Sequence, residues 1–195
     1  MLTARDALDI YQLITCRGIR LWICGGWGVD ALLEQATRPH HDLDVLMLVD
    51  DVTRLRRLLA RNGFRLKEYW EENRWVTDGA GKRIATAFVL CDLHERELDV
   101  HALHLNTEGN GLPDWEKAEG FIFTPEDLGG EGLIAGEPVA CLSVAMQMRA
   151  HSGYQIPEKQ FGDIEGLHRK FGVDYPRGYS PREAGLPLQT RPGGE

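Results

Sequence analysis

Three aspartates have residue types and spacing that suit a divalent-metal site. Asp42 and Asp44 are separated by one residue at the start of the apolar segment 43–49, and Asp99 lies in the alternating segment 97–102. Side chains alternate between the two faces of a strand, so Asp42 and Asp44 are expected on one face, where unpaired carboxylates repel each other. A shared Mg²⁺ removes that repulsion and prefers oxygen ligands. The pair alone also fits a solvated strand start, but a neighbouring strand carrying Asp99 would complete the site.

A glycine pair, Gly25-Gly26, follows the short apolar segment 21–24 and precedes a segment of helical character. Backbone N–H groups at such a turn, with the positive end of a helix, bind phosphate, and glycine permits its close approach. Glycine pairs at strand ends are also ordinary turns. Three carboxylates beside a bound triphosphate would suit nucleotidyl transfer, because metal neutralises the phosphates and a carboxylate accepts the proton of the attacking hydroxyl.

A dinucleotide-binding site is a competing interpretation of the same turn. Residues 26–31 fit the pattern G-x-G-x-x-G/A, and Asp50 lies about 20 residues further on, where a ribose-binding acid is expected. That fold requires repeated parallel strand–helix units, whereas hairpin signals follow Gly63. It also has no use for the carboxylates of Asp42 and Asp44, so the sequence favours nucleotidyl transfer.

The composition is that of an acidic globular protein. The chain has 195 residues, of which 43% are hydrophobic and 27% charged, with a net charge of -8. This charge disfavours nucleic acid as a partner and suits divalent metals and cationic small molecules. The four cysteines form no paired framework, the first residues do not resemble a signal peptide, and no apolar run is long enough to span a membrane. We therefore expect a cytoplasmic protein without a membrane partner.

The elements that must position these groups form a mixed sheet. The expected class is α/β of the α+β type, because a strand–helix–strand start is followed by antiparallel strands, with residues 78–81 as a hairpin turn. We expect helices at 3–18, 27–33, 51–62, 143–151 and 157–171. We expect strands at 21–24, 43–49, 64–69, 75–77, 84–90, 97–102 and 121–123, a loop at 106–113 and a hairpin over 133–141. We predict a nucleotidyltransferase core at 1–142, a helical part at 143–172 and an irregular tail at 173–195.

The order of these motifs resembles that of the DNA polymerase β-like nucleotidyltransferases, especially the lincosamide nucleotidyltransferases and the aminoglycoside 2''-adenylyltransferases. The segments that carry the resemblance are 25–30, 37–42, 42–44, 98–101, 151–154 and 159–167. Together they extend over roughly residues 5–172 in motif order. The resemblance implies a mixed sheet flanked by helices, followed by a small helical C-terminal part.

The resemblance also implies a reaction and its residues. A nucleoside monophosphate would pass from a Mg²⁺-bound triphosphate, ATP or GTP, to a hydroxyl, with release of pyrophosphate. The implied roles are metal ligands for Asp42 and Asp44, general base or third ligand for Asp99, and triphosphate binding for Gly25, Gly26 and Lys159. Segments 92–97, 106–120 and the tail match nothing in the family pattern, which leaves the acceptor open.

Two residues near the acidic strand have alternative interpretations. Arg38 could bind phosphate with its guanidinium fork, or pair with Asp30 or Glu34. For Asp30 we expect the structural pair with Arg38. His40 could orient its loop or a carboxylate, or simply pack in the loop. His101 shares the strand face of Asp99, which predicts a role in binding the acceptor.

Other candidate groups carry weaker signals. The spacings Cys91-x-x-His94 and His101-x-x-His104 superficially resemble zinc sites but lack the usual set of thiolates, so no zinc is expected. Tryptophans can stack on a base or line an acceptor pocket, although most belong to a core. The candidates for such a role are Trp27, Trp70, Trp75 and Trp115.

The main prediction is therefore a metal-dependent nucleotidyltransferase, acting as a monomer or homodimer on a small hydroxylated molecule such as a lincosamide or aminoglycoside antibiotic. Two other functions remain open at this point. One is a polymerase β-like antitoxin or regulatory module that acts on a protein or RNA partner. The other is the dinucleotide-binding domain.

Overall fold

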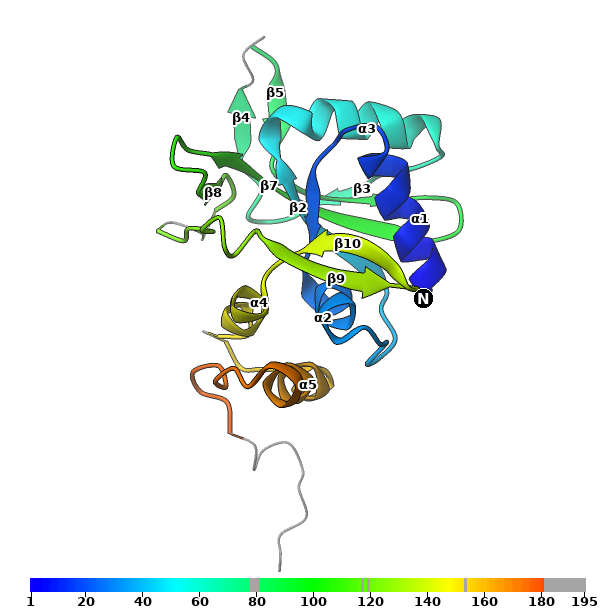
Figure 1. Cartoon of the computed structure of the whole chain (residues 1–195). Coiled ribbons are helices and arrows are strands. Elements are labelled where there is room, and N and C mark those ends of the chain that lie inside the picture. Colours follow the sequence, from blue (N-terminus) through cyan, green and yellow to red (C-terminus); the bar gives the residue numbers. More distant parts are fainter. Residues whose placement is uncertain (78–80, 117, 119, 153, 181–195) are drawn as a thin grey trace, which may run out of the picture.

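The computed structural model describes residues 1–77, 81–116, 118, 120–152 and 154–180 (Figure 1). Residues 78–80 of the predicted turn, Gly153 and the tail beyond residue 180 lie outside this part of the chain. The helices are α1 (Ala4–Thr15), α2 (Gly25–Leu33), α3 (Val52–Arg61), α4 (Val144–Ala150) and α5 (Phe161–Phe171), with short 3-10 helices η1 (Val49–Asp51) and η2 (Glu158–Gln160). The strands are β1 (Leu21–Ile23), β2 (Asp42–Leu48), β3 (Arg65–Tyr69), β4 (Trp75–Thr77), β5 (Arg83–Ala85), β6 (Ala87–Cys91), β7 (Glu97–Leu105), β8 (Gly111–Pro113), β9 (Gly130–Ile134) and β10 (Glu137–Cys141).

Eight of the described strands form one mixed sheet, as the sequence predicts. Their order is β3-β6-β7-β2-β1-β10-β9, with β8 paired to β7. Strand β2 is parallel to β7 and β1 is parallel to β10, whereas β1 and β2 are antiparallel. Strands β4 and β5 form a separate pair that projects beside α3 (Figure 1).

The antiparallel pairing of β1 with β2 is incompatible with a dinucleotide-binding fold, whose first strands are parallel and joined by a crossover helix. Asp50, the candidate ribose-binding acid, lies in η1, at the end of β2 opposite to Asp42. The expected proximity of the acidic strands is confirmed, because β7 is the parallel neighbour of β2 and Asp44 is directly opposite Asp99 in the register.

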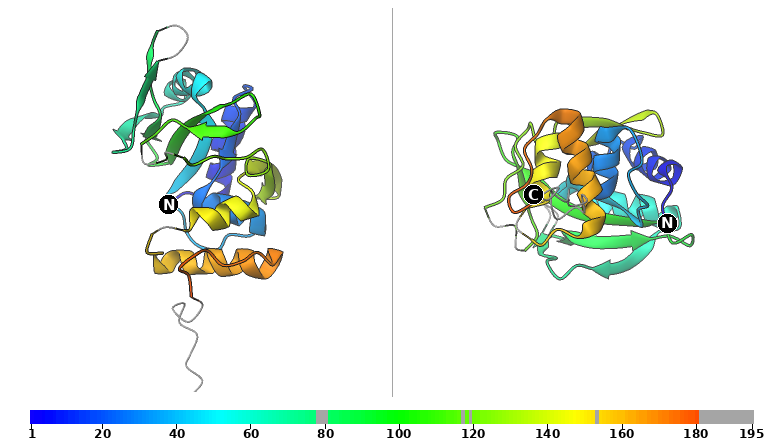
Figure 2. Two further views of the ribbon diagram at one scale, coloured as in Figure 1. Left: turned by 90° about the vertical axis from the view of Figure 1, so that its left-hand side faces the viewer. Right: turned by 90° about the horizontal axis from the view of Figure 1, so that it is seen from below.

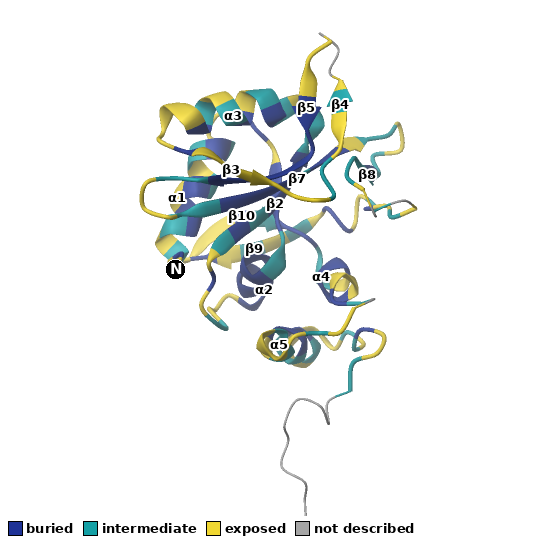
Figure 3. Ribbon diagram, turned by 180° about the vertical axis from the view of Figure 1, so that it is seen from behind, coloured by how far each residue is buried: buried dark blue, intermediate teal, exposed yellow. Residues whose placement is uncertain are grey.

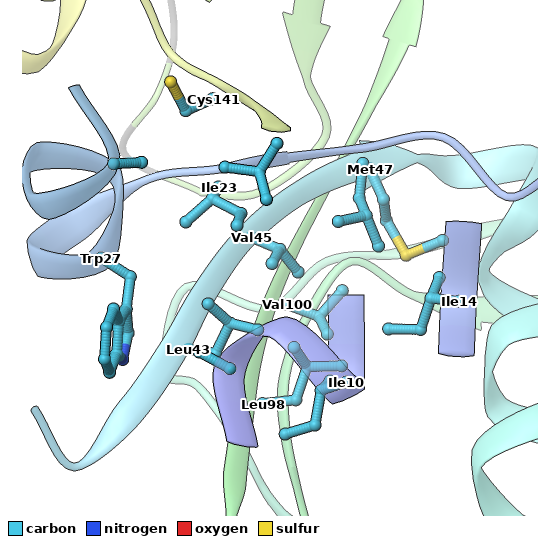
Figure 4. Packing of buried hydrophobic residues seen from close by; sticks show 14 of the residues in the cluster. Ile10, Ile14, Ile23, Trp27, Leu43, Val45, Met47, Leu98, Val100 and Cys141 are labelled. Carbon is cyan, nitrogen blue, oxygen red and sulfur yellow. The ribbon is translucent and has the colours of Figure 1, made fainter. Parts of the chain in front are cut away.

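The two faces of the sheet carry separate hydrophobic clusters. Met47 of β2 belongs to the larger cluster, to which α1 and α2 contribute, and Figure 4 shows it near Ile14 of α1. Leu46 belongs to the smaller cluster on the opposite face. The buried members of this smaller cluster are Trp22, Leu46, Leu103, Phe123, Leu128, Leu142 and Met146. Because strand side chains alternate, Asp42 and Asp44 lie on the face of the smaller cluster.

Helices α1, α2 and α4 begin at side-chain caps or at a glycine. Thr3 and Asp6 form a capping box at α1, and the Ser143 side chain accepts a hydrogen bond from the backbone of α4. Helix α2 begins at Gly25, two residues before the predicted start, and is buried along nearly its whole length between the sheet and α5 (Figure 2). By contrast, β3 is exposed at the sheet edge (Figure 3).

Several sequence predictions need correction. The predicted loop at 106–113 contains β8, which pairs with β7, and the predicted strand at 121–123 makes only an isolated bridge between Phe123 and Gly111. The predicted strand at 84–90 is two strands, because β5 pairs with β4 in the separate sheet while β6 pairs with β3 and β7; the buried hydroxyl of Thr86 lies between them and contacts loop carbonyl groups. The predicted hairpin over 133–141 is confirmed as β9 and β10. None of the described helices is long and apolar enough to span a membrane.

Candidate active site

The structure brings the three predicted carboxylates together. Asp42 and Asp44 extend from β2 and Asp99 from β7, and one oxygen of each lies within 4.8 Å of the others. Asp99 is buried, while the other two are partly buried. Carboxylate oxygens at this separation match the donors that Mg²⁺ and similar hard cations prefer. The arrangement can therefore hold a divalent cation.

Electrostatics in this cluster are unfavourable without a cation. Burial, together with the negative charges of Asp42 and Asp99, raises the pKa of Asp44 to about 7. Burial and the charge of Asp44 also raise the pKa of the Cys24 thiol, which therefore stays protonated at neutral pH and is no nucleophile. A bound cation would relieve the repulsion among the carboxylates, so the donor set fits a metal.

The glycine turn packs directly against these groups. Gly25 has a φ of 57°, in the left-handed region, and a Cβ there would overlap the Asp44 carboxylate. A Cβ on Gly26 would overlap the His40 ring and lie 2.7 Å from Nη2 of Arg38. The two glycines are therefore required by the packing of the site itself, in addition to any approach of a phosphate. Their position at the start of α2 leaves backbone N–H groups at its positive end.

Arg38 pairs with neither of the acids suggested by the sequence. Its Nε donates to Oδ2 of Asp163 in α5 at 3.0 Å, and its Nη1 lies 3.1 Å from Nδ1 of His40. The expected pair with Asp30 or Glu34 is wrong because α5 docks against α2 and supplies the partner from the far end of the chain. Periodicity in the sequence carries no signal for this contact.

Asp30 has a structural position with different partners. Its carboxylate accepts from His40 Nε2 at 2.7 Å and from both the backbone N–H and the hydroxyl of Thr37, at 3.0 and 2.6 Å. It is only 3% exposed, so these bonds satisfy a buried charge. His40 thus orients a carboxylate, one of the two roles that the sequence suggests.

Asp99 has one neighbour that the sequence indicates, His101, and one that it does not, Trp70. Trp70 Nε1 donates to Oδ1 of Asp99 at 2.9 Å, and His101 Nδ1 lies 3.3 Å from the same oxygen. His101 Nε2 lies 3.4 Å from Glu72 Oε1. Burial alone would lower the pKa of His101, but the hydrogen bonds and charges of Asp99 and Glu72 outweigh it and raise that pKa.

A cavity of about 670 Å³ opens from the carboxylates towards the C-terminal helices. Its wall includes Gly25, Gly26 and Arg38 on one side. Aromatic and apolar side chains form another part of the wall: Leu46, Trp115, Phe121, Phe123, Leu142 and Met146. Helices α4 and η2 contribute polar groups, and the volume of the cavity is in the range of small-molecule binding sites.

Two residues of the C-terminal helices line the cavity. Lys159 was a candidate from the sequence, whereas Gln147 was not. Lys159 lines the cavity from η2, in the turn before α5 where the sequence predicts helix. Gln147 of α4 was not predicted; it is fully buried, lines the cavity, and neither amide atom has a hydrogen-bond partner among the described residues. Its Nε2 lies so close to Gly28 that a Cβ there would overlap it. A buried amide without a partner is unusual, and its place in the cavity wall makes Gln147 a candidate contact for a polar ligand.

Most of the other candidate residues from the sequence lie outside the cavity. Within the described residues, the carboxylates of the site are the only group of three potential metal ligands, which gives the zinc spacings no support. Trp27 is buried against His40, and Trp75 packs with Tyr69 outside the cavity. Trp115 lines the cavity, with its ring edge against His101.

Comparisons with known proteins agree with this geometry. The model of the aminoglycoside-2''-adenylyltransferase family matches residues 6–167. A lincosamide resistance protein from Staphylococcus haemolyticus is 25% identical over 167 residues, which are 85% of this chain and 94% of that protein. A 2''-aminoglycoside nucleotidyltransferase from Klebsiella pneumoniae is 26% identical over 142 residues, which are 69% of this chain and 66% of that protein.

Solved structures share the fold. The lincomycin-bound crystal structure of the lincosamide antibiotic adenylyltransferase LnuA superposes with a TM-score of 0.68 at 24% identity, covering 85% of this chain and 96% of that one. The complex of ANT(2")-Ia with adenylyl-2"-tobramycin gives a TM-score of 0.64 at 22% identity, covering 87% of this chain and 89% of that one. The predicted nucleotidyltransferase fold is confirmed.

Proposed function

The chain belongs to the aminoglycoside-2''-adenylyltransferase family, and from that premise we propose that it transfers a nucleoside monophosphate from ATP or GTP to a hydroxyl of a small molecule. The observation that carries the proposal is the meeting of three carboxylates, within 4.8 Å, against a glycine turn at the start of a helix. Family membership supports this transferase over an antitoxin or regulatory module.

Asp42, Asp44 and Asp99 are the residues that would hold Mg²⁺. All three offer oxygen donors, and the repulsion that raises the pKa of Asp44 to about 7 is relieved by a cation. When bound, the cation would neutralise phosphate charge and orient the triphosphate. The backbone N–H groups of Gly25 and Gly26 would bind the phosphates as well, assisted by the positive charges of nearby basic side chains. We assign that role to Arg38 and Lys159.

In the proposed reaction, the acceptor hydroxyl oxygen attacks the α-phosphorus of the triphosphate. The bond between that phosphorus and the oxygen leading to the β-phosphate breaks, pyrophosphate leaves, and the hydroxyl proton passes to the Asp99 carboxylate. Trp70 and His101 both contact Oδ1 of Asp99, which supports Oδ2 as the proton acceptor. His101, at the cavity wall beside Asp99, would bind the acceptor.

The cavity wall favours an acceptor with large apolar surfaces and few positive charges. The carboxylates among its described lining residues are Asp42 and Asp44, both of which the cation would occupy. Arg149 and Lys159 also line the cavity, and the Arg149 guanidinium lies over the Phe121 ring. An aminoglycoside carries several amines that need acidic partners, so we place a lincosamide first among acceptors. An aminoglycoside is the second candidate, since the matching family model carries that description.

We place the reaction in the cytoplasm, where nucleoside triphosphates and Mg²⁺ are supplied. The cysteines are free thiols, which suits a reducing compartment. Action as a monomer or homodimer stays a prediction.

The test is pyrophosphate release measured with each nucleoside triphosphate, Mg²⁺ and a plate of acceptors that includes lincosamides and aminoglycosides. We expect turnover with a lincosamide that depends on Mg²⁺ and falls about a hundred- to a thousandfold in D42N and in D44N, as removal of a central electrostatic group does. Asp50→Asn is the matched control, since Asp50 lies at the other end of β2. Full turnover by D42N and D44N with every acceptor would refute the proposal.

A further inference from the structure

Asp163 is a buried carboxylate that connects α5 to the loop before β2. It is 1% exposed, and its two oxygens have different partners. Oδ2 accepts from Arg38 Nε at 3.0 Å, and Oδ1 lies 2.9 Å from Thr37 Oγ1, whose single hydroxyl proton also faces Asp30 Oδ1 at the shorter distance of 2.6 Å. The sequence separation from Arg38 is 125 residues, so only the docking of α5 on α2 makes these contacts. A buried carboxylate that accepts from a guanidinium N–H holds that arginine in one arrangement.

The Arg38 guanidinium is held on a second side by His40. Arg38 Nη1 lies 3.1 Å from His40 Nδ1, and a guanidinium can only donate hydrogen bonds. Nδ1 of His40 therefore accepts, and the ring proton lies on Nε2, which donates to Oδ2 of Asp30 at 2.7 Å. Two nitrogens of the Arg38 fork are thus fixed by groups on α5 and in the loop itself.

The third nitrogen of the fork points at the glycine turn. Nη2 of Arg38 lies 2.7 Å from the position that a Cβ on Gly26 would take, and Arg38 lines the cavity. The hydrogen bonds of Arg38 to other described residues use Nε and Nη1, which leaves Nη2 available for a ligand. A phosphate bound at the start of α2 would therefore meet an N–H group that is already oriented.

We propose that Asp163 is a positioning residue for the triphosphate, acting through Arg38. Without an anchor, a long Arg side chain must lose rotamer freedom when it binds phosphate; the bond to Asp163 removes that freedom in advance. Helix α5 then contributes to the nucleotide site, through Asp163, as well as to the packing of the fold. The inference rests on the proposed function, because it takes the glycine turn to be the triphosphate site.

The test uses inorganic tripolyphosphate with Mg²⁺ as a ligand that has phosphates but no base. Its dissociation constant is measured by calorimetry for the full-length protein and for D163N. We expect binding about tenfold weaker in D163N, the loss typical of one charge-assisted hydrogen bond. In pyrophosphate release the variant should raise KM for the nucleotide more than it lowers kcat. Lys170→Ala is the matched control, because Lys170 Nζ also links α5 to α2, at Leu32 O, away from the glycine turn.

A double-mutant cycle separates positioning from simple stabilisation of the fold. If Asp163 acts through Arg38, R38A and the double variant R38A/D163N bind tripolyphosphate equally weakly. Additive losses in the two variants would overturn the inference. So would unchanged binding in D163N, or an equal loss in K170A.

One more variant keeps the inference open to test if D163N does not fold. R38K preserves a positive charge beside Asp163 but cannot reach both the carboxylate and the turn, since its ammonium is a compact charge without the extended fork of a guanidinium. We expect R38K to fold and to lose about the same affinity as R38A. Binding of R38K at the level of the unmodified protein would refute the role of the anchored fork. Failure of the unmodified protein itself to bind tripolyphosphate or release pyrophosphate would refute the proposed function, and this inference with it.

Discussion

The indole Nε1 of Trp70 donates a hydrogen bond of 2.9 Å to Oδ1 of Asp99 across the sheet edge. Asp99 is 7% exposed, and His101 contacts the same oxygen, so one side of the carboxylate is fixed by two donors. A general base works best when its reacting oxygen is held in one orientation. The Trp70 contact thus has a direct consequence for the rate of the proposed reaction.

Trp70→Phe should lower kcat without abolishing it. The ring volume is largely kept, while the hydrogen bond to Asp99 is lost, and we expect a three- to tenfold fall, typical for one such bond at about 1 kcal/mol. The measurement is steady-state pyrophosphate release. Trp75→Phe serves as the control, because Trp75 packs with Tyr69 and Arg83 outside the cavity. A kcat unchanged in W70F, or equally lowered in W75F, would contradict the role of Trp70.

Gly25→Ala should remove activity and destabilise the fold. The φ of 57° costs an L-residue about 1–2 kcal/mol, and the new Cβ would also displace the Asp44 carboxylate. Gly63→Ala separates the two effects, since Gly63 also has a positive φ, of 88°, but a Cβ there would meet nothing within 4 Å. Thermal unfolding and turnover measure both variants. We expect G63A to lose stability without losing turnover. Full turnover by G25A would show that the close packing of the turn against the carboxylate is not needed for activity.

The stability of the metal-free protein should fall as the pH rises through 7. The folded-state pKa of Asp44, raised by burial and by Asp42 and Asp99 to about 7, exceeds its unfolded value of 3.8. The folded state therefore binds the proton more tightly. This contribution is complete below about pH 4 and is lost as the pH rises through about 7. With about 1.4 kcal/mol per pKa unit, the loss is on the order of a few kcal/mol.

Asp44→Asn removes this dependence. In EDTA at pH 8 its melting temperature should exceed that of the unmodified protein, whereas the two should converge near pH 4. Added Mg²⁺ should stabilise the unmodified protein at pH 8 and have little effect on D44N, because binding only the folded state raises stability. Parallel pH profiles for the two proteins would show that Asp44 is not the group responsible. Asp50→Asn again gives the control.

Gln147→Met should separate stability from ligand binding. Gln147 is fully buried with both amide atoms unpartnered among the described residues, so Met, of similar volume, loses no described hydrogen bond. We expect the ligand-free variant to be equally stable or more stable by about 1 kcal/mol. Binding of substrates should weaken about tenfold, as the loss of a buried polar partner does. Calorimetry with nucleotide and with acceptor tells which substrate contacts the amide, and undiminished affinity for both would rule out that contact.

Local patterns in the sequence were sufficient for most of the strands and for the face that carries the acids. Alternation placed Asp42 and Asp44 on one side, and the glycine pair marked the start of α2 to within two residues. These features follow from backbone geometry, which acts between near neighbours in the chain. Local patterns did not predict the break at Thr86 between β5 and β6. The carbonyl groups that its hydroxyl contacts lie in loops elsewhere in the chain.

The tertiary structure alone decided which side chains complete the site. Trp70 donates to Asp99, Gln147 lines the cavity from α4, and Asp163 binds Arg38 from α5; no local periodicity marks these contacts. Arg38 was a candidate in the sequence, but the acids predicted to pair with it were wrong. Ion pairing depends on which helix docks beside the arginine. Contacts of this kind arise when whole elements pack, and the burial that fixes them also makes an unpaired charge costly. The sequence by itself thus determined the acids and the turn, and packing determined what holds and orients them.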